Sequence, residues 1–223
     1  MSNSNSSSYL KYALGEIILV VIGILIAVAL NNWNEERKQR VEIQNVHQLV
    51  KENLQADIEA IDVILETYDK TEFIYKKYLN NEIVAKDFSE IQILPYFILG
   101  YPQLKLNQRG YQLLQKFSDS LDKTDDQLTT DIISFYVEML HEVKVDDTYR
   151  ADNFEENLNH WKTYEWWPEY ITRKDFKDFI EYAMNDADYR NRVASAYFIN
   201  FSVFKPEIEE YKEKAKKLIE QID

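Results

Sequence analysis

The stretch IILVVIGILIAVAL at residues 17–30 decides how the N-terminal part of this chain folds. It is apolar throughout, and the 22 residues from Tyr12 to Trp33 that contain it would form an α-helix of about 33 Å, at about 1.5 Å per residue. This length fits the hydrocarbon core of a bilayer, which is about 30 Å thick. Tyr9 and Tyr12 precede the run and Trp33 follows it, as amphipathic rings do at the level of lipid headgroups. The sequence therefore predicts a transmembrane helix over residues 9–34.

A cleavable secretory signal is the alternative to an uncleaved anchor. Residues 27–29, AVA, resemble a small-residue cleavage site, and the apolar run is short enough for a signal. Residues 2–8, SNSNSSS, with the single Lys11 do not form the basic segment that opens a secretory signal. We therefore expect an uncleaved anchor, preceded by a disordered segment at residues 1–8.

The charges that flank the predicted span bear on its orientation. Arg37, Lys38 and Arg40 follow the span, whereas only Lys11 precedes it, so a literal count favours a cytoplasmic C-terminal side. Long domains translocate regardless of such a small difference, so the count alone does not fix the orientation.

One stripe of the predicted span combines a carboxylate with small residues. At about 100° per residue it consists of Tyr12, Glu16, Val20, Gly23, Ala27, Leu30 and Asn34. The small pair Gly23 and Ala27 would let two helices approach closely, and Glu16 would gain a partner when they do. The alternative is that Glu16 lies one turn inside the interface and reaches headgroups or Lys11. We take Tyr12, Glu16, Gly23 and Ala27 as candidate residues for helix packing within the membrane.

The rest of the chain is acidic and poor in residues that break helices. The 223 residues include 26 Lys and Arg against 39 Asp and Glu, and the whole net charge of −13 follows residue 34. Because nucleic-acid binding needs clustered basic residues, no nucleic-acid partner is expected. Only four Gly and four Pro occur, so glycine-rich phosphate loops are excluded, and the lack of Cys excludes disulfides and thiolate sites.

Apolar residues at three- and four-residue spacing predict a long helix from about residue 36 to residue 79, which leaves open continuity with the span. Its stripe consists of Ile43, Val46, Val50, Leu54, Ile58, Ile61, Leu65, Tyr68, Tyr75 and Leu79. Four-residue steps at residues 46, 50 and 54 are a stutter for a coiled coil and are ordinary in bundle packing, which we favour. An irregular stretch with Pro95, Gly100 and Pro102 follows, to about Asn107.

Further helices are predicted after residue 107. They are residues 108–117 capped by Asn107, a long helix from Thr124 or Asp125 to Pro168, residues 172–184, and residues 186–222 with an interruption at Pro206. The stripe of the long helix is Leu128, Ile132, Phe135, Met139, Val143, Tyr149, Phe154, Leu158 and Trp161. No strand alternation is seen. The predicted fold class is all-α, an N-terminal transmembrane helix followed by a bundle of long helices in a water-facing domain over residues 35–223.

Two stretches, KYALGEIILVVIGILIA at residues 11–27 and NNWNEERK at residues 31–38, resemble the opening of an uncharacterised family of small single-span membrane proteins from Bacteroidota. Residues 109–114, RGYQLL, and 211–215, YKEKA, are similar to later segments of that family in layout. The resemblance implies a helical domain after the span. Members usually begin with a basic amphipathic stretch that holds the N terminus in the cytoplasm, where this chain has Ser and Asn. The resemblance implies no catalytic residue.

Few residues suit metal binding or catalysis. Glu156 and His160 are spaced four apart on one helix face, and His141 lies beside Glu142, but no HExxH motif and no paired Glu-x-x-His motif occurs. An ordinary surface pair is the more common interpretation of such spacing. Adjacent acidic residues diverge by about 100° on a helix, and no serine lies in a GxSxG or SxxK setting. We therefore expect no metal, no cofactor and no enzymatic activity.

Aromatic and acidic residues are interleaved at residues 161–170. The candidate binding residues are Trp161, Glu165, Trp166, Trp167 and Glu169, with Tyr164 and Tyr170 beside them. Flat rings next to carboxylates commonly hold sugars or cationic groups. Rings at a helix break also commonly close the end of a bundle as core, which is the interpretation we favour, with Pro168 fixing the turn. The ring cluster remains the best single candidate for a binding surface.

Together these patterns predict a non-enzymatic, single-pass membrane protein. The family resemblance, more than the charge count, implies an inner-membrane protein whose helical domain lies in the periplasm. The expected partners are the lipid bilayer and either a second copy of the chain or another envelope protein. The alternative is a sensor-like helical bundle that binds a ligand, because long helices next to a membrane are suitable levers.

Overall fold

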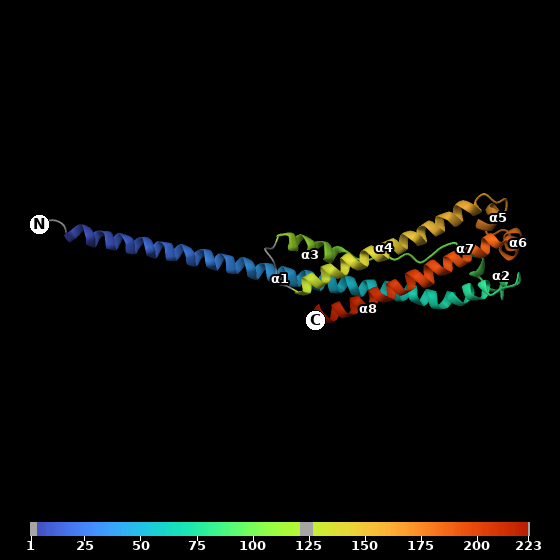
Figure 1. Ribbon diagram of the computed structural model, residues 1–223, viewed down its shortest axis with the longest axis horizontal. Coiled ribbons are helices and arrows are strands. Elements are labelled where there is room, and N and C mark those ends of the chain that lie inside the picture. Colours follow the sequence, from blue (N-terminus) through green and yellow to red (C-terminus); the bar gives the residue numbers. More distant parts are fainter. Residues whose placement is uncertain (1–3, 121–126, 223) are drawn as a thin grey trace. The chain divides into compact units, whose positions relative to one another are not determined.

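The computed structural model describes residues 4–120 and 127–222, and the side chains of residues 12–117 and 127–222. Every element in these ranges is helical, which confirms the predicted all-α class (Figure 1). The chain divides into two compact units, residues 1–47 and residues 48–223, and each is described by itself. The first helix, α1 (Ser4–Leu79), contributes to both units. The continuity between the span and the helix over residues 36–79, which the sequence left open, is thus observed.

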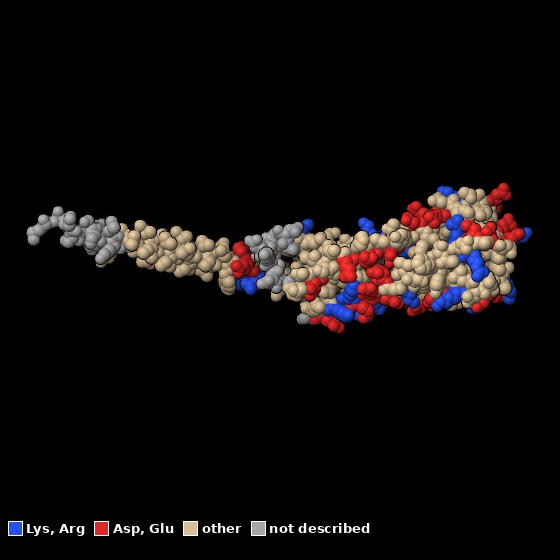
Figure 2. All heavy atoms as spheres, viewed as in Figure 1, with Lys and Arg blue, Asp and Glu red and all other residues tan. Residues whose placement is uncertain are grey.

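In the first unit, α1 carries the long apolar stretch. All side chains from Tyr12 to Trp33 are exposed, so nothing in the described chain covers this stretch. Figure 2 shows it tan on the visible face, with charged side chains beginning at its C-terminal end. By length and composition it is long and apolar enough to cross a membrane, although an N-terminal signal sequence has the same properties.

The expected disordered segment at residues 1–8 is only partly within the described chain. Residues 4–8 are the first residues of α1, which differs from the expectation, and residues 1–3 lie outside the described ranges. Adding residues to an existing helix costs far less than nucleating one, so the apolar run can carry the polar residues before it into the helix.

The second unit consists of the C-terminal part of α1 and the shorter helices that follow it. These are α2 (Asp87–Glu90), the 3₁₀ turn η1 (Leu94–Tyr96), α3 (Arg109–Ser120), α4 (Gln127–Trp161), α5 (Trp167–Ile171), α6 (Lys177–Asn185), α7 (Ala187–Tyr197), the π-helix η2 (Phe198–Phe204) and α8 (Lys205–Ile222). The helices α4 and α8 pack side by side, and η2 contacts both (Figure 1). The core of the unit lies between these helices and α1.

The apolar stripe predicted for α1 forms its buried face. Val50, Leu54, Ile61, Tyr68 and Tyr75 are all buried. The stripe deviates in the middle. Buried positions there include Asp57 and Ile64, whereas the predicted Ile58 and Leu65 are only half-buried.

The helix α3 approaches α1 closely at Gly110. A Cβ atom on Gly110 would lie 2.7 Å from Val50 Cγ2 and 3.0 Å from the Val50 Cα, so only glycine fits here without a shift. The Gly110 amide donates to Asn53 Oδ1 at 3.0 Å. Asn107, predicted as the cap of this helix, donates its backbone amide and its side chain to Asp57 Oδ1, at 2.9 and 2.6 Å. Asn107 therefore joins the loop to α1.

The helix α4 ends earlier than predicted, and its predicted stripe is buried from Ile132 to Val143 but changes in the C-terminal half. It ends at Trp161, whereas Pro168 lies in the first turn of α5, a position that suits proline. The predicted starts at Thr124 and Asp125 lie outside the described residues. In the C-terminal half the polar residues Asp146, Arg150 and Asn157 are buried, whereas Tyr149 is 56% exposed. At about 100° per residue these polar residues share a face with Val143 and Trp161 and Tyr149 does not.

The C-terminal helices also differ from the prediction at their boundaries. The helix predicted from residue 172 begins as α6 at Lys177, because Thr172 ends α5 and donates its hydroxyl to the Pro168 carbonyl at 2.6 Å. Pro206 does not interrupt the last helix. The chain stays helical from α7 through the π-helix η2 into α8, and Pro206 occupies the first turn of α8.

Candidate functional site

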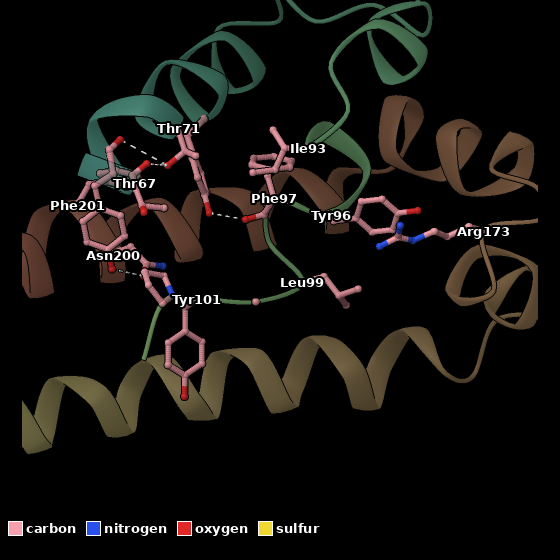
Figure 3. A pocket seen from close by; sticks show the side chains of 14 residues that line it. Thr67, Thr71, Ile93, Tyr96, Phe97, Leu99, Tyr101, Arg173, Asn200 and Phe201 are labelled. Atoms are coloured by element: carbon pink, nitrogen blue, oxygen red, sulfur yellow. Dashed lines mark hydrogen bonds between the residues drawn. The ribbon is translucent and has the colours of Figure 1, made fainter. Parts of the chain in front are cut away.

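A hollow of about 440 Å³ lies in the second unit, among segments far apart in the sequence (Figure 3). It is lined by α1, by the loop with η1, by η2 and by the turn after α5. The lining residues are Thr67, Tyr68, Thr71, Tyr75, Ile93, Tyr96, Phe97, Leu99, Gly100, Tyr101, Pro102, Arg173, Asn200 and Phe201. Its volume falls in the range of sites that hold small molecules, about 300–1,000 Å³.

The tyrosines of α1 hold the loop and the π-helix in place around the hollow. Tyr75 Oη donates to the Phe97 carbonyl at 2.8 Å, and the two rings pack edge to face with centroids 4.7 Å apart. Phe201 packs on both Tyr75 and Tyr68, at centroid distances of 5.1 and 5.0 Å. These ring contacts make the wall of the hollow apolar and well supported.

Asn200 links the wall to a buried arginine. Its Oδ1 accepts hydrogen bonds from Tyr68 Oη at 2.9 Å and from Arg150 Nε at 3.3 Å. Its Nδ2 donates to the Ala196 carbonyl at 2.8 Å. Asn200 lies within η2, and π-helical segments are uncommon and often found at functional sites.

Arg150 is a fully buried cation behind the hollow. Its guanidinium carbon lies 3.7 Å from the Phe204 ring centroid and 4.5 Å from that of Tyr101. Nη1 pairs with Asp147 Oδ1 at 3.1 Å, and Nη2 donates to the Pro102 carbonyl. Burial lowers the pKa of Arg150 and raises that of Asp147, because both charged forms lose solvent. Burial also raises the pKa of Tyr68 to about 12, so its hydroxyl stays protonated near neutral pH.

Arg173 supplies an exposed cation at the rim. Its guanidinium carbon lies 5.0 Å from the ring centroid of Tyr96, and Figure 3 shows the two side chains next to each other. Arg173 has φ +59°, an uncommon value for a residue with a side chain, and its amide donates to the Tyr170 carbonyl at 3.0 Å. Among the described residues, Arg173 forms no ion pair with a carboxylate.

The chemistry of this hollow suits binding. The hydroxyls of Thr67 and Thr71 donate to backbone carbonyls of α1. Those of Tyr68 and Tyr75 donate to Asn200 and to the Phe97 carbonyl. The described lining holds no Asp, Glu, His or Ser that could act as base or nucleophile. What remains for a ligand is mainly carbon surface, the Arg173 guanidinium and the hydroxyls of Tyr96 and Tyr101.

The predicted ring cluster at residues 161–170 mostly forms the core at one end of the bundle. Trp161 is 1% exposed and donates from Nε1 to Tyr182 Oη at 3.0 Å. Trp166 is 9% exposed and packs on Phe179 and Tyr182. The core interpretation therefore holds for these two rings, because aromatic side chains of α5, α6 and α7 pack around them.

The remaining members of the predicted cluster lie at the surface. Trp167 is half-buried, and Glu165 and Glu169 are exposed. A hollow of about 570 Å³ does bring rings and carboxylates together near this end. Its lining is Tyr164, Trp166, Asp178, Glu181, Tyr182, Asn185, Asp186 and Ala187, which excludes Glu165 and Glu169. A surface role for Trp167, Glu165 and Glu169 stays a prediction.

Of the pair Glu156 and His160 singled out from the sequence, only His160 takes part in a polar contact between helices. His160 Nε2 lies 3.0 Å from Asp188 Oδ2 and 3.0 Å from Tyr164 Oη, whereas Glu156 is exposed. In the described part of the chain no three His, Asp or Glu side chains gather as a metal site would require.

The candidate packing residues of the span all lie on α1 in the first unit. Tyr12, Glu16, Gly23 and Ala27 are exposed, and a Cβ added at Gly23 meets nothing within 4 Å. The face is therefore free to meet a second helix, and helix packing through it stays a prediction.

Sequence reasoning missed Arg150, Asn200, Arg173 and Tyr101. Only Arg150 had a usable signal, since it lies in phase with the buried Val143 and Trp161 on α4. The others occupy a turn, a loop and a π-helix, where no periodic pattern indicates which side chains converge.

Comparisons with known proteins bear on residues on both sides of the unit boundary. Residues 16–99 match the model of a family of unknown function, DUF6090. This range includes most of the N-terminal signature and the α1 and η1 walls of the hollow, whereas Arg173 and Asn200 lie beyond it. The comparison with curated proteins and the comparison with solved structures each gave no match. Residues 16–99 of this chain are thus similar to the DUF6090 family of unknown function.

Proposed function

We propose that this chain is a single-span protein of the inner membrane whose helical domain lies in the periplasm and acts by binding a second copy of itself or another envelope component. The observation that carries the anchor is that every residue from Tyr12 to Trp33 is exposed. Burial of apolar surface is worth about 25 cal/mol per Å², so this stretch is stable only against lipid or another apolar surface.

The periplasmic orientation rests on the family resemblance more than on flanking charges. Fusion of alkaline phosphatase after Asp223 should give active enzyme, because this reporter folds only in the periplasm. Fusion of a cytoplasmic fluorescent protein at the same residue is the matched control and should be dark. A bright fluorescent fusion with an inactive but expressed phosphatase fusion would reverse the topology.

The uncleaved anchor is tested on the same material. The purified chain should retain residues 9–34 by intact mass and stay in the membrane pellet after alkaline carbonate. A mature N terminus directly after Ala29 would instead identify a secretory signal.

A binding role is supported by the packed core and by the absence of Asp, Glu, His and Ser from the described lining of the hollow. Crosslinking in the native host, followed by purification in detergent and mass spectrometry, should recover either crosslinked copies of the chain or a specific envelope protein. Recovery of monomer alone would contradict the association.

A sensor-like ligand-binding bundle is the second candidate. The specific observation in its favour is the apolar hollow between α1, the η1 loop and η2, because a ligand there would touch three elements at once. Its test is ligand binding at that hollow.

A further inference from the structure

Two neighbouring hollows share the surface around Arg173. The hollow of about 440 Å³ and a second one of about 680 Å³ have Ile93, Tyr96 and Arg173 in common. The second is otherwise lined by Phe88, Ser89, Gln92, Pro95, Phe176 and Ile180. Neither described lining contains a carboxylate, and Arg173 is the one charged residue in either, in a chain with 39 acidic residues. A surface whose one charged residue is a cation, in a chain that is acidic overall, favours an anionic ligand.

We propose that these hollows bind an amphiphilic anion, a small molecule with an apolar chain or ring and a carboxylate or phosphate head that pairs with Arg173. The inference deepens the second candidate function, the ligand-binding bundle, and rests on it.

The head group follows from the guanidinium at the rim. Arg173 lies against the Tyr96 ring and, among the described residues, has no carboxylate partner, so its donors are free for a ligand. A guanidinium matches a carboxylate or a phosphate with two parallel hydrogen bonds. Stacking on the ring limits the motion of the side chain before the ligand arrives, which lowers the entropic cost of binding.

The body of the ligand follows from the walls. Ile93 is exposed on one side, and Phe97, Leu99 and Phe201 supply carbon surface on the other, while the polar atoms of Tyr68 and Tyr75 are turned to protein partners. An uncharged polar ligand such as a sugar would find few free donors or acceptors here. An apolar chain displaces water from this surface at about 0.8 kcal/mol per CH₂.

The buried Arg150 behind the wall favours the same sign of charge. Its partner Asp147 is part exposed and so is screened by water, whereas the guanidinium is enclosed in protein. Arg150 contacts Tyr101 and the Pro102 carbonyl, both of which line the hollow. At Tyr68, on the wall of the hollow, the charge of Arg150 acts more strongly than that of Asp147, whereas at Tyr101 the order is reversed. The buried guanidinium therefore favours an anionic head on the Tyr68 side of the hollow.

The proposal is tested with the full chain in phosphatidylcholine nanodiscs. Octanoate and octyl phosphate serve as anionic probes, and octanamide serves as an uncharged probe of the same chain length. Titration calorimetry with empty nanodiscs subtracted gives the affinity, and hydrogen exchange of the full chain locates the site. At least one of the two anions should bind and should slow hydrogen exchange of the backbone amides at residues 93–102 and 172–176.

The variants separate charge from structure. Arg173→Gln should weaken binding of the anionic probe about fivefold or more, since an exposed charge pair is lost, and leave octanamide unchanged. Arg173→Lys should restore part of the affinity. Lys174→Gln is the matched control. It removes a charge of the same sign at the next residue, whose side chain lies outside both hollows, and it should change the affinity less than twofold.

The outcomes distinguish the sources of the ligand and the failure of the proposal. Tighter octanoate indicates a fatty-acid-like ligand, and tighter octyl phosphate indicates a phospholipid-like one. Three results would each overturn the proposal: absence of anion binding, an affinity for octanamide equal to that of the tighter anion, or equal weakening by Arg173→Gln and Lys174→Gln. None of these results would affect the anchor or the association, which the fusion and crosslinking experiments measure separately.

Discussion

The guanidinium carbon of Arg150 lies 3.7 Å from the centroid of the Phe204 ring, inside the bundle. The arginine comes from α4 and the ring from η2, so a cation–π contact joins two core elements. The remaining donors of Arg150 reach Asn200, Asp147 and the Pro102 carbonyl. One side chain therefore holds the loop, the π-helix and α4 together.

Arg150→Ala should destabilise the domain by about 3–5 kcal/mol, because it breaks a buried ionic and hydrogen-bonded network and leaves a cavity. Urea unfolding in detergent, followed by tryptophan fluorescence, measures the change. Lys144→Ala, on the exposed face of the same helix, is the control and should stay within about 0.5 kcal/mol of wild type. A similar small change for both variants would show that the network contributes little.

Gly110→Ala should also destabilise the domain, by about 1 kcal/mol or more. The added Cβ would lie 3.0 Å from the Cα and N of Val50, and backbone atoms cannot move aside as a side-chain end can. This loss must exceed the gain of about 1 kcal/mol that alanine brings to a helix. Gly100→Ala adds a Cβ that meets nothing within 4 Å and is the control. Equal or increased stability of Gly110→Ala would disprove the close approach.

Asp57 should make the stability of the domain depend on pH. Burial raises its pKa above the ordinary 3.8, despite hydrogen bonds from Tyr211 and Asn107. The folded state thus holds this proton more tightly than the unfolded state, so the contribution of Asp57 is largest at low pH and falls as the pH rises above about 3.8 through the raised folded pKa.

Asp57→Asn removes this dependence. The unfolding free energy of the variant relative to wild type should therefore increase as the pH rises from about 3.5 to neutrality, and then become constant. Urea unfolding at a series of pH values measures it. Asp152→Asn, at an exposed carboxyl on α4, should follow the wild-type profile at every pH. A flat difference for Asp57→Asn across the range would count against the raised pKa.

Trp166 and Trp167 should behave differently although they are adjacent. Trp166→Ala removes a buried ring packed on Phe179 and Tyr182 and should lower the unfolding free energy by about 3–5 kcal/mol. Trp167→Ala should lower it much less and should reduce the amount of partner recovered after crosslinking. Unchanged recovery with Trp167→Ala would remove this ring from the binding surface.

Self-association through the span is tested at Gly23. Gly23→Ile should reduce the oligomer in detergent, because a branched side chain blocks the close approach of two helix backbones. Gly15→Ile makes the same substitution off the stripe, where an added Cβ also meets nothing in the chain, and should leave the oligomer intact. If both variants keep the size of wild type, any assembly must involve the other helices.

The periodic parts of the fold could be predicted from the sequence. The α1 stripe through Val50, Leu54 and Tyr68 follows simple three- and four-residue spacing, and its residues are buried. The C-terminal half of α4 could not be predicted in this way, because Asp146 and Arg150 occupy buried positions that a search for apolar residues does not detect. They can be buried because a network of partners replaces water around them.

The candidate site was beyond prediction from pattern alone. Its lining comes from residues 67–75, 93–102, 173 and 200–201, and only tertiary packing brings these together. Arg173 follows α5 at a positive φ, which no spacing rule indicates. The ring cluster at Trp161 and Trp166 was predicted to be aromatic core or surface, and only burial distinguishes the two.

The π-helix η2 accommodates one residue more than an α-helix of the same number of turns would contain. Buried residues from Ala196 through Asn200 and Phe204 to Ile208 follow one another at steps of four. Three such steps cover 12 residues, whereas three α-helical turns cover about 11. The wide turn absorbs the additional residue, so both flanking helices keep their apolar faces on the core. Related chains that have lost a single residue here should keep the same core with an unbroken α-helix, which makes this segment a natural point for length variation.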